Sequence, residues 1–253
     1  MRPNIIFFLI DGLRADQVHG PHKTSITPNI DALIQKGLYF TNAFSSVDGT
    51  IVSLNTIFNG DFQIGNSARA QRVNLKKDNL FDVLKKNGYK IFGTLPNFGS
   101  FDNLLKEFEN KMDDVKDNNY SIDPVEAQFK QEEIDDSHSE YERNKATLPT
   151  GLAEKIIKVL NSDTIQNPFF CYFHIFDLHP LREGKNPIGI GNFDKIEFGT
   201  STYARTVSSI DYWLGKILEN IDLENTLVVL TADHGERIPY ENTRAVDFQP
   251  KLE

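Results

Sequence analysis

Runs of apolar residues are the main pattern along this chain. Residues 4–11 form an apolar run that ends in an acid, and residues 89–95, 169–177 and 226–231 are also rich in large apolar side chains. Strands buried on both faces of a parallel sheet have such runs, so we predict four strands here. Residues 38–44 instead alternate like a strand with one buried face, which predicts a fifth strand.

Helical patterns lie between these runs. Thr27 supplies a cap and Pro28 a first-turn proline for one helix. The other predicted helices comprise residues 50–58, 79–87, 152–160 and 203–221. Because strands and helices alternate, we predict an α/β fold with a mostly parallel central sheet and helices on both faces.

Length and composition favour one soluble domain. The 253 residues suit a single α/β domain, and a division in two would leave small cores. The hydrophobic content of 39% and the charged content of 25% are ordinary for a globular protein. Residues from about 110 to 147 are acidic, rich in amides and aperiodic, so we predict a surface insertion there.

Charge, cysteine content and hydropathy exclude several classes of protein. The net charge of −9 argues against a nucleic-acid binder, which needs basic surface. The single cysteine, Cys171, excludes a disulfide framework, and its apolar surroundings predict an inert buried thiol. No apolar run approaches the ~20 residues of a membrane span, and residues 5–10 are too short for a signal-peptide core. The printed sequence therefore predicts a cytoplasmic location and leaves export open.

Polar residues follow three of the predicted strands: Asp11, then Asp177 and His179, then Asp233 and His234. Ligands bind at the carboxyl ends of strands in open parallel sheets, so we expect these residues at one rim. A buried acid is costly without a compensating cation or donor, and carboxylates with an imidazole suit zinc, manganese, magnesium or calcium. Taken singly, Asp11 could instead cap a helix, and His234 could instead be a solvated histidine in a turn. The clusters together favour a metal site.

Thr50 begins a predicted helix directly after Gly49. Backbone amides and the positive end of the helix dipole favour an anion at such a position. A threonine here is often only an N-cap, a role worth about 1 kcal/mol, and this segment alone leaves that alternative open. Beside a metal, the hydroxyl can instead ionise and attack phosphorus.

Four blocks of sequence, in order, resemble those of one enzyme family. They comprise residues 3–16, 27–37, 203–218 and 225–236. Together they resemble the sulfatase branch of the alkaline-phosphatase-like superfamily. The resemblance implies an alkaline-phosphatase-like fold and one divalent metal ion, with a second left open. Its implied metal ligands are Asp11, Thr50, Asp233 and His234, and Thr50 also matches the position of the catalytic nucleophile.

The sequence departs from sulfatases at the nucleophile. Sulfatases have Cys-x-Pro-Ser-Arg there and convert the cysteine to formylglycine, whereas residues 50–54 read Thr-Ile-Val-Ser-Leu. A threonine at this position resembles the phosphodiesterases and the phosphoethanolamine or glycerol-phosphate transferases of the superfamily. Gly12 also replaces the second acid that is usual after Asp11, which resembles the one-metal transferases.

Residues 173–180 resemble the substrate-contacting segment of the family. By this resemblance His179 is a catalytic residue that stabilises or protonates the leaving group, and His174 and Asp177 bind substrate. Alternatively, His174 and Asp177 belong to a second metal. Strand alternation puts the side chains of His174 and Asp177 on opposite faces of the sheet, unless the strand has ended by then.

Family members continue well beyond the last matching block, so we expect a truncated C-terminal part. Three functions follow. The first is a metal-dependent phosphoesterase or phosphotransferase with a covalent Thr50 intermediate, which the ligand set favours. The second is a sulfuric ester hydrolase, and the third is an inactive domain that binds metal or a partner. The expected substrate is a small-molecule, glycan-linked or lipid-linked ester, and the sequence indicates no oligomeric state.

Overall fold

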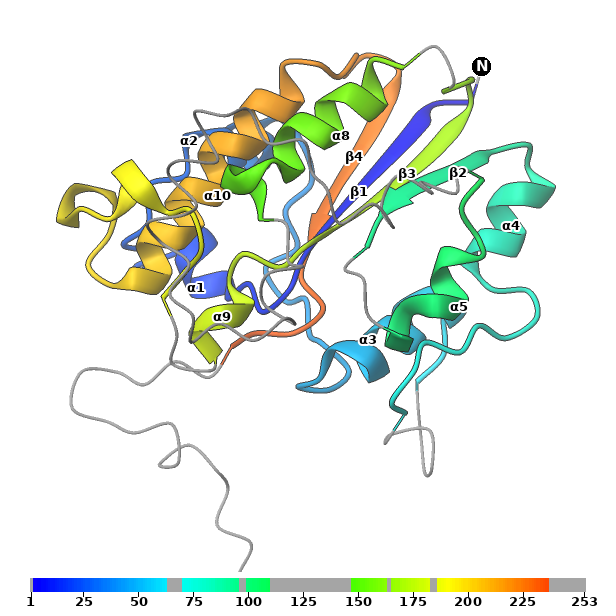
Figure 1. Cartoon of the computed structure of the whole chain (residues 1–253), viewed down its shortest axis with the longest axis horizontal. Helices are drawn as coiled ribbons and strands as arrows, with labels where there is room; N and C mark the ends of the chain where they lie inside the picture. Colours follow the sequence, from blue (N-terminus) through cyan, green and yellow to red (C-terminus); the bar gives the residue numbers. More distant parts are fainter. Residues whose placement is uncertain are drawn as a thin grey trace, which may run out of the picture.

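Four parallel strands form the sheet of the computed structural model, which describes residues 2–62, 70–95, 99–109, 147–162, 165–182 and 186–236. Their bounds are β1 Asn4–Ile10, β2 Lys90–Thr94, β3 Phe169–Ile175 and β4 Thr226–Thr231. The strand order is β2-β3-β1-β4, so β1 lies between β3 and β4 (Figure 1). The predicted parallel α/β fold and the four strands predicted from apolar runs are therefore confirmed.

The strands on either side of β1 end at nearly the same level as β1 itself. Ile10 pairs in register with Ile175 of β3, and Leu9 pairs in register with Thr231 of β4. The backbone N–H of Asp11 also donates to the carbonyl of Ile175 at 2.9 Å. The residues that follow these three strands therefore meet at one rim of the sheet, as the parallel arrangement requires.

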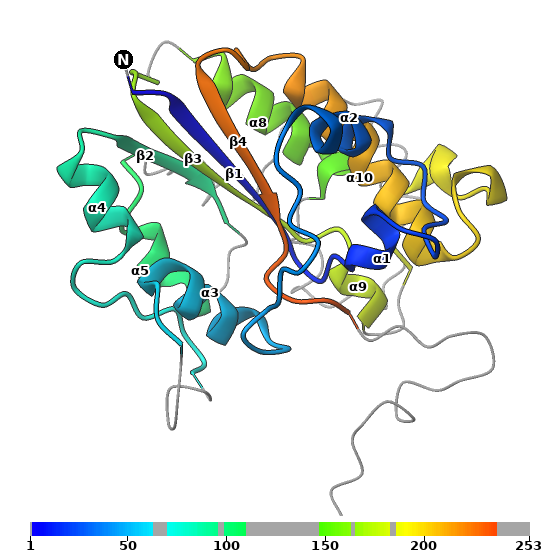
Figure 2. The same cartoon turned by 180° about the vertical axis from the view of Figure 1, so that it is seen from behind.

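Helices cover both faces of the sheet, with α2, α8 and α10 on one face and α3, α4 and α5 on the other (Figures 1 and 2). The α-helices are α1 Ala15–Val18, α2 Pro28–Lys36, α3 Thr50–Asn59, α4 Leu80–Lys86, α5 Asp102–Leu105, α8 Leu152–Leu160, α9 His179–Arg182 and α10 Thr202–Leu218. Short 3₁₀ helices are η2 Gly99–Phe101, η4 Leu148–Thr150, η5 Gly191–Phe193 and η6 Ile196–Phe198. All the predicted helices are present.

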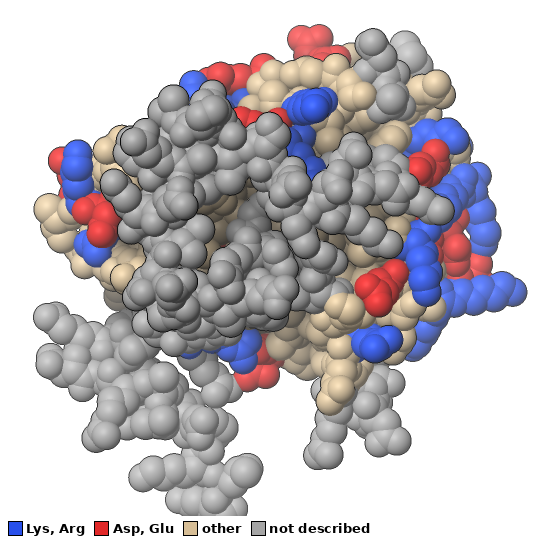
Figure 3. Space-filling view, viewed as in Figure 1, with Lys and Arg blue, Asp and Glu red and all other residues tan. Residues whose placement is uncertain are grey.

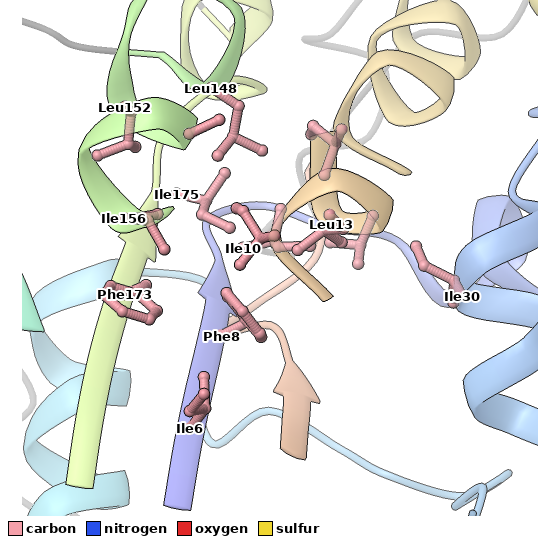
Figure 4. Close-up of a cluster of buried hydrophobic side chains, with 14 of the residues drawn as sticks. Ile6, Phe8, Ile10, Leu13, Ile30, Leu148, Leu152, Ile156, Phe173 and Ile175 are labelled. Atoms are coloured by element: carbon pink, nitrogen blue, oxygen red, sulfur yellow. The ribbon is translucent and has the colours of Figure 1, made fainter. Parts of the chain in front are cut away.

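Two hydrophobic clusters, one on each face, hold the helices to the sheet. The cluster beneath α8 and α10 is largely aliphatic, and Figure 4 shows its members from β1 and β3: Ile6, Phe8, Ile10, Phe173 and Ile175. The opposite cluster is rich in aromatic rings: Phe58, Phe81, Phe108, Phe170 and Tyr172. Alternation along β3 places His174 on this aromatic side, where its ring contacts those of Tyr172 and Phe101.

Residues 38–44 form no strand, contrary to the prediction. They are irregular and turn structure that runs beside β4 in both views of the fold (Figures 1 and 2). Leu38, Phe40 and Phe44 are 89%, 74% and 88% exposed. A strand needs a neighbour that bonds to its backbone, and none of the residues described in the structure pairs with this segment. Its side-chain pattern was therefore insufficient to predict its conformation.

The predicted surface insertion at about 110–147 falls almost wholly on residues 110–146, which lie outside the described residues. Elsewhere, surface charges of both signs are interspersed. Figure 3 shows Lys and Arg side chains beside acids on the side of the molecule that carries α4, where Lys85 pairs with Glu107 at 2.7 Å and Lys86 with Asp78 at 2.5 Å. In the described part of the chain, no helix combines the length and apolar character that crossing a bilayer requires.

Candidate active site

Four of the predicted site residues meet at the carboxyl ends of β1 and β4. Asp11 follows β1, Asp233 and His234 follow β4, and Thr50 begins α3. Ligand atoms of Asp11, Asp233 and His234 all lie within 4.8 Å of one another, and the three residues are buried. The Thr50 hydroxyl lies 3.1 Å from Oδ2 of Asp11 and 3.1 Å from Nε2 of His234. The fold thus collects these side chains from three separate parts of the chain.

Backbone hydrogen bonds orient the Asp233 carboxylate. Its Oδ1 accepts from the N–H of Gly12 at 3.2 Å and from the N–H of His234 at 2.9 Å. Its Oδ2 is buried, accepts no hydrogen bond from the residues that the structure describes, and lies 3.4 Å from Nε2 of His234. One oxygen is therefore fixed by the backbone, and the other is directed into the cluster, where a ligand atom is needed.

His234 presents one ring nitrogen to the same cluster. Its Nδ1 lies 2.9 Å from the carbonyl oxygen of Gly235, a contact in which Nδ1 carries the proton and donates. Nε2 then offers a lone pair toward Thr50 and Asp11, whose Oδ1 is 3.7 Å away. The residue is only 3% exposed, so the alternative of a solvated histidine in a turn is wrong.

Thr50 does not cap α3. The N-cap is Gly49, which has no side chain, and Thr50 is the first helical residue. The hydroxyl donates to Oδ2 of Asp11 instead, so the alternative of a capping threonine is wrong. The helix-capping alternative for Asp11 is also wrong, because the N-cap of the next helix, α1, is Arg14.

The turn after Asp11 depends on Gly12 and Tyr203. Gly12 has φ +73°, a left-handed conformation that glycine adopts without steric cost, and this lets the chain reverse directly after β1. The Tyr203 hydroxyl donates to the Gly12 carbonyl at 2.7 Å and accepts from the N–H of Arg14 at 2.8 Å. Helix α10 therefore holds the turn that carries the first acid of the cluster.

Burial and charge shift the pKa values of the two carboxylates in opposite directions. Burial raises the pKa of Asp11, but the imidazoles of His174 and His179 outweigh it and hold this pKa below its ordinary value. Burial, together with the negative charge of Asp11, raises the pKa of Asp233. Among the described residues, none donates a hydrogen bond to the buried Oδ1 of Asp11 or the buried Oδ2 of Asp233. A divalent cation fits this set, because it would offset both charges and bind both oxygens.

Two histidines from the end of β3 flank Asp11 on its other side. Nε2 of His174 lies 3.6 Å from Oδ2 of Asp11, and Nδ1 of His179 lies 3.7 Å from Oδ1. The His174 side chain is completely buried, whereas that of His179 is 14% exposed. Of the two, only His179 is therefore open to an incoming molecule.

The carboxylate of Asp177 holds a backbone position near the end of β3. Both of its oxygens face the N–H of Leu148, at 3.1 and 3.2 Å. Burial raises the pKa of Asp177 to about 7. β3 ends at Ile175, so strand alternation does not decide where Asp177 points. Contact of His174 and Asp177 with substrate, or with a second metal, remains a prediction.

Three hydroxyl residues support the site and escaped the sequence prediction: Ser53, Tyr172 and Tyr203. The Ser53 hydroxyl donates to the carbonyl of Asp233 at 2.5 Å, and the Tyr172 hydroxyl lies 2.7 Å from Nδ1 of His174. Ser53 is one helical turn after the nucleophile position, and Tyr172 lies two residues before the histidine on the same strand. Helix and strand periodicity put such pairs on one side, so a weak signal existed.

Comparison with known proteins identifies the family and the fold of the chain. The family model described as Sulfatase matches residues 3–250. The ulvan-active sulfatase of Formosa agariphila is 26% identical over 251 residues, which cover 92% of this chain and 45% of that protein. The crystal structure of the phosphonate monoester hydrolase of Agrobacterium radiobacter has a TM-score of 0.64 at 16% identity and covers 92% of this chain and 63% of that chain.

A membrane enzyme has the same fold. The integral membrane protein lipooligosaccharide phosphoethanolamine transferase A of Neisseria meningitidis has a TM-score of 0.55 at 16% identity, over 92% of this chain and 42% of that chain. The chain spans less than half the length of the curated relatives that it matches. The family model nevertheless covers almost every residue, and this protein belongs to the sulfatase family.

Proposed function

We propose that this protein is a metal-dependent enzyme that cleaves or transfers phosphate esters through a covalent intermediate on Thr50. One observation carries the proposal. The Thr50 hydroxyl does not cap α3 and lies 3.1 Å from both Asp11 and His234. Beside it are two buried carboxylate oxygens that accept no hydrogen bond in the described part of the chain. A lone hydroxyl among acids and an imidazole is an arrangement for activating a nucleophile rather than for stabilising a fold.

Asp11, Thr50, Asp233 and His234 would hold the cation. When bound, a divalent ion lowers the pKa of a hydroxyl and offsets the charge of the group being transferred. The mixed oxygen and nitrogen ligands accept zinc, manganese, magnesium or calcium, and the residues do not discriminate among them.

Each side chain of the site has a separate part in the reaction. The Oγ of Thr50 attacks phosphorus, and its proton leaves along the hydrogen bond to Oδ2 of Asp11. The bond from phosphorus to the alcohol oxygen breaks, and His179 donates a proton to that oxygen. Water or a second alcohol then attacks phosphorus and gives up a proton to His179, the bond from phosphorus to Oγ breaks, and the proton held by Asp11 returns to Thr50. The amino end of α3, where Thr50 is the first helical residue, favours the anionic group throughout.

Hydrolysis of sulfate esters is the second candidate, and it is favoured by membership of the family and by the name of the ulvan-active relative. It would require an unmodified threonine to act where other family members use formylglycine. The one cysteine of the sequence, Cys171, is buried in the aliphatic cluster, so it offers no substitute nucleophile. We therefore prefer phosphorus over sulfur as the reacting centre.

The test is turnover of three chromogenic substrates by the purified chain with manganese or zinc: a phosphate diester, a phosphate monoester and a sulfate ester. We expect diester or monoester turnover, its loss in Thr50→Ala, and a phosphothreonine at Thr50 when the reaction is quenched and examined by mass spectrometry. Thr56→Ala is the matched control, because Thr56 lies on the same helix and bonds to the carbonyl of Val52.

Turnover of the sulfate ester alone would favour the second candidate. A chain that binds metal but turns over no ester would favour the third function, an inactive domain. Phosphate turnover that survives Thr50→Ala would contradict the covalent route.

A further inference from the structure

A buried row of three side chains runs from β3 to the candidate metal site. The Tyr172 hydroxyl lies 2.7 Å from Nδ1 of His174, and Nε2 of His174 lies 3.6 Å from Oδ2 of Asp11. We propose that His174 is a positioning residue, which orients the Asp11 carboxylate for the cation, and that Tyr172 selects the tautomer of His174 that does so. The proposal rests on the metal site proposed above, and it assigns a role to a histidine that the reaction scheme does not use.

Burial favours a supporting role for His174 over direct contact with substrate. Its side chain has no exposed surface, and Asp11 beside it has none either. The Phe176 ring stacks on the imidazole with centroids 4.4 Å apart, and the Phe101 ring meets it edge-on at 5.5 Å. These rings fix the plane of the imidazole, so the direction in which Nε2 points is set by packing.

Hydrogen bonding indicates where the proton of His174 lies. The Tyr172 hydroxyl can donate to Nδ1, whereas the opposite tautomer would leave the lone pair of Nε2 facing the carboxylate of Asp11, which repels it. A neutral imidazole that accepts at Nδ1 carries its own proton on Nε2. Nε2 is buried and makes no hydrogen bond within the described part of the chain. Its N–H group therefore points toward Oδ2 of Asp11.

The consequence is a division of labour between the two oxygens of Asp11. Oδ2 receives the hydroxyl proton of Thr50 and faces the N–H of His174. Oδ1 accepts no hydrogen bond from any described residue and remains available to a cation. A neutral His174 with its proton on Nε2 has no lone pair to offer there, so on this proposal it is not a ligand of a second metal.

Two substitutions of His174 distinguish a role in orienting Asp11 from a role in packing alone. The amide nitrogen of His174→Gln reaches about as far as Nε2, whereas that of His174→Asn reaches only the place of Nδ1. The full chain, stripped of metal, is titrated with Mn²⁺ or Zn²⁺ against a competing fluorescent chelator. We expect His174→Asn to bind metal about 10–100-fold more weakly and His174→Gln to stay within about threefold of the parent. Tyr172→Phe should fall between them, and the exposed His22→Asn should change nothing.

Equal affinity of His174→Asn and the parent would overturn the proposal, as would equal losses in His174→Asn and His174→Gln. If His174→Asn does not fold, ¹⁵N NMR of the metal-free parent decides, because a proton on Nδ1 of His174 rather than on Nε2 overturns the assignment. A folded parent that binds no metal contradicts the metal site itself, and with it this inference. If the parent binds metal and His174→Asn binds it equally tightly, the role of His174 is contradicted but the metal site is not.

Discussion

β3 and β4 both pair with β1, and each is followed by an acid and a histidine, yet the two strand ends contribute differently to the site. After β4, Asp233 and His234 are adjacent, and backbone groups hold one atom of each so that the other faces the cluster. After β3, Asp177 binds the backbone of Leu148, while His179 turns back toward Asp11. Under the proposed function, an acid of the same type is therefore a metal ligand after β4 and a support for the backbone after β3, according to the backbone groups that lie nearby.

Removing the acid after each strand is the strongest test of the difference between the ends of β3 and β4. Asp233→Asn should abolish measurable Mn²⁺ binding and lower phosphate-ester turnover by about 10⁴-fold or more, because it removes a charged ligand. Asp177→Asn should leave metal affinity within about threefold, since its carboxylate serves the backbone of Leu148. Chelator competition and initial rates measure both effects, and similar losses in the two variants would contradict the distinction.

The histidine after β3 should matter for chemistry and not for the metal. We expect His179→Ala to lower turnover of an ester with an alkyl leaving group by about 10²-fold, because the departing oxygen then lacks a proton donor. A nitrophenyl ester, whose leaving group departs without a proton, should be affected much less. Metal affinity should stay unchanged. A loss of the same size for both leaving groups would show that His179 acts in some other way.

The hydrogen bond that holds the backbone after β4 can be removed without changing a proposed metal ligand. Ser53→Ala removes the donor to the Asp233 carbonyl, so we expect metal affinity to fall by about tenfold. Loss of one buried hydrogen bond should lower the free energy of unfolding by about 1 kcal/mol. Ser46→Ala is the control, because its hydroxyl bonds to Thr56 instead. A Ser53→Ala chain with parental metal affinity would mean that the backbone alone holds the ligand.

The smallest expected effect is a pH signature of the β3 end. Asp177 has a pKa of about 7 in the folded chain against an ordinary value of 3.8, so folding favours its protonated form. This contribution is complete below the unfolded pKa and is lost as pH rises to about 7. From pH 4 to 7 the metal-free parent should therefore lose about 1 kcal/mol or more relative to Asp177→Asn. Urea unfolding at several pH values measures this, and parallel stability curves would contradict it.

The elements that could be predicted are those whose signal is local. The apolar run Thr226–Thr231 and the helix Leu152–Leu160 have the bounds expected from the sequence, and the rim residues follow from strand direction. Residues 38–44 could not be predicted, because a strand also depends on a partner that the pattern does not specify. The role of Tyr203 was equally hidden, since its two hydrogen bonds to the turn after Asp11 join segments that only the tertiary fold brings together.

The left-handed turn at Gly12 has a consequence for how this site can change by mutation. Sulfatases usually carry a second acid at this position, and the single substitution Gly12→Asp would introduce one here. A Cβ atom added here would lie 3.4 Å from Oε2 of Glu236, and the φ of +73° costs a residue with a side chain roughly 1–2 kcal/mol. The new carboxylate would also repel that of Glu236 in a largely buried position. The backbone conformation and Glu236 thus make the one-step mutational path from this ligand set to a two-acid set costly in stability.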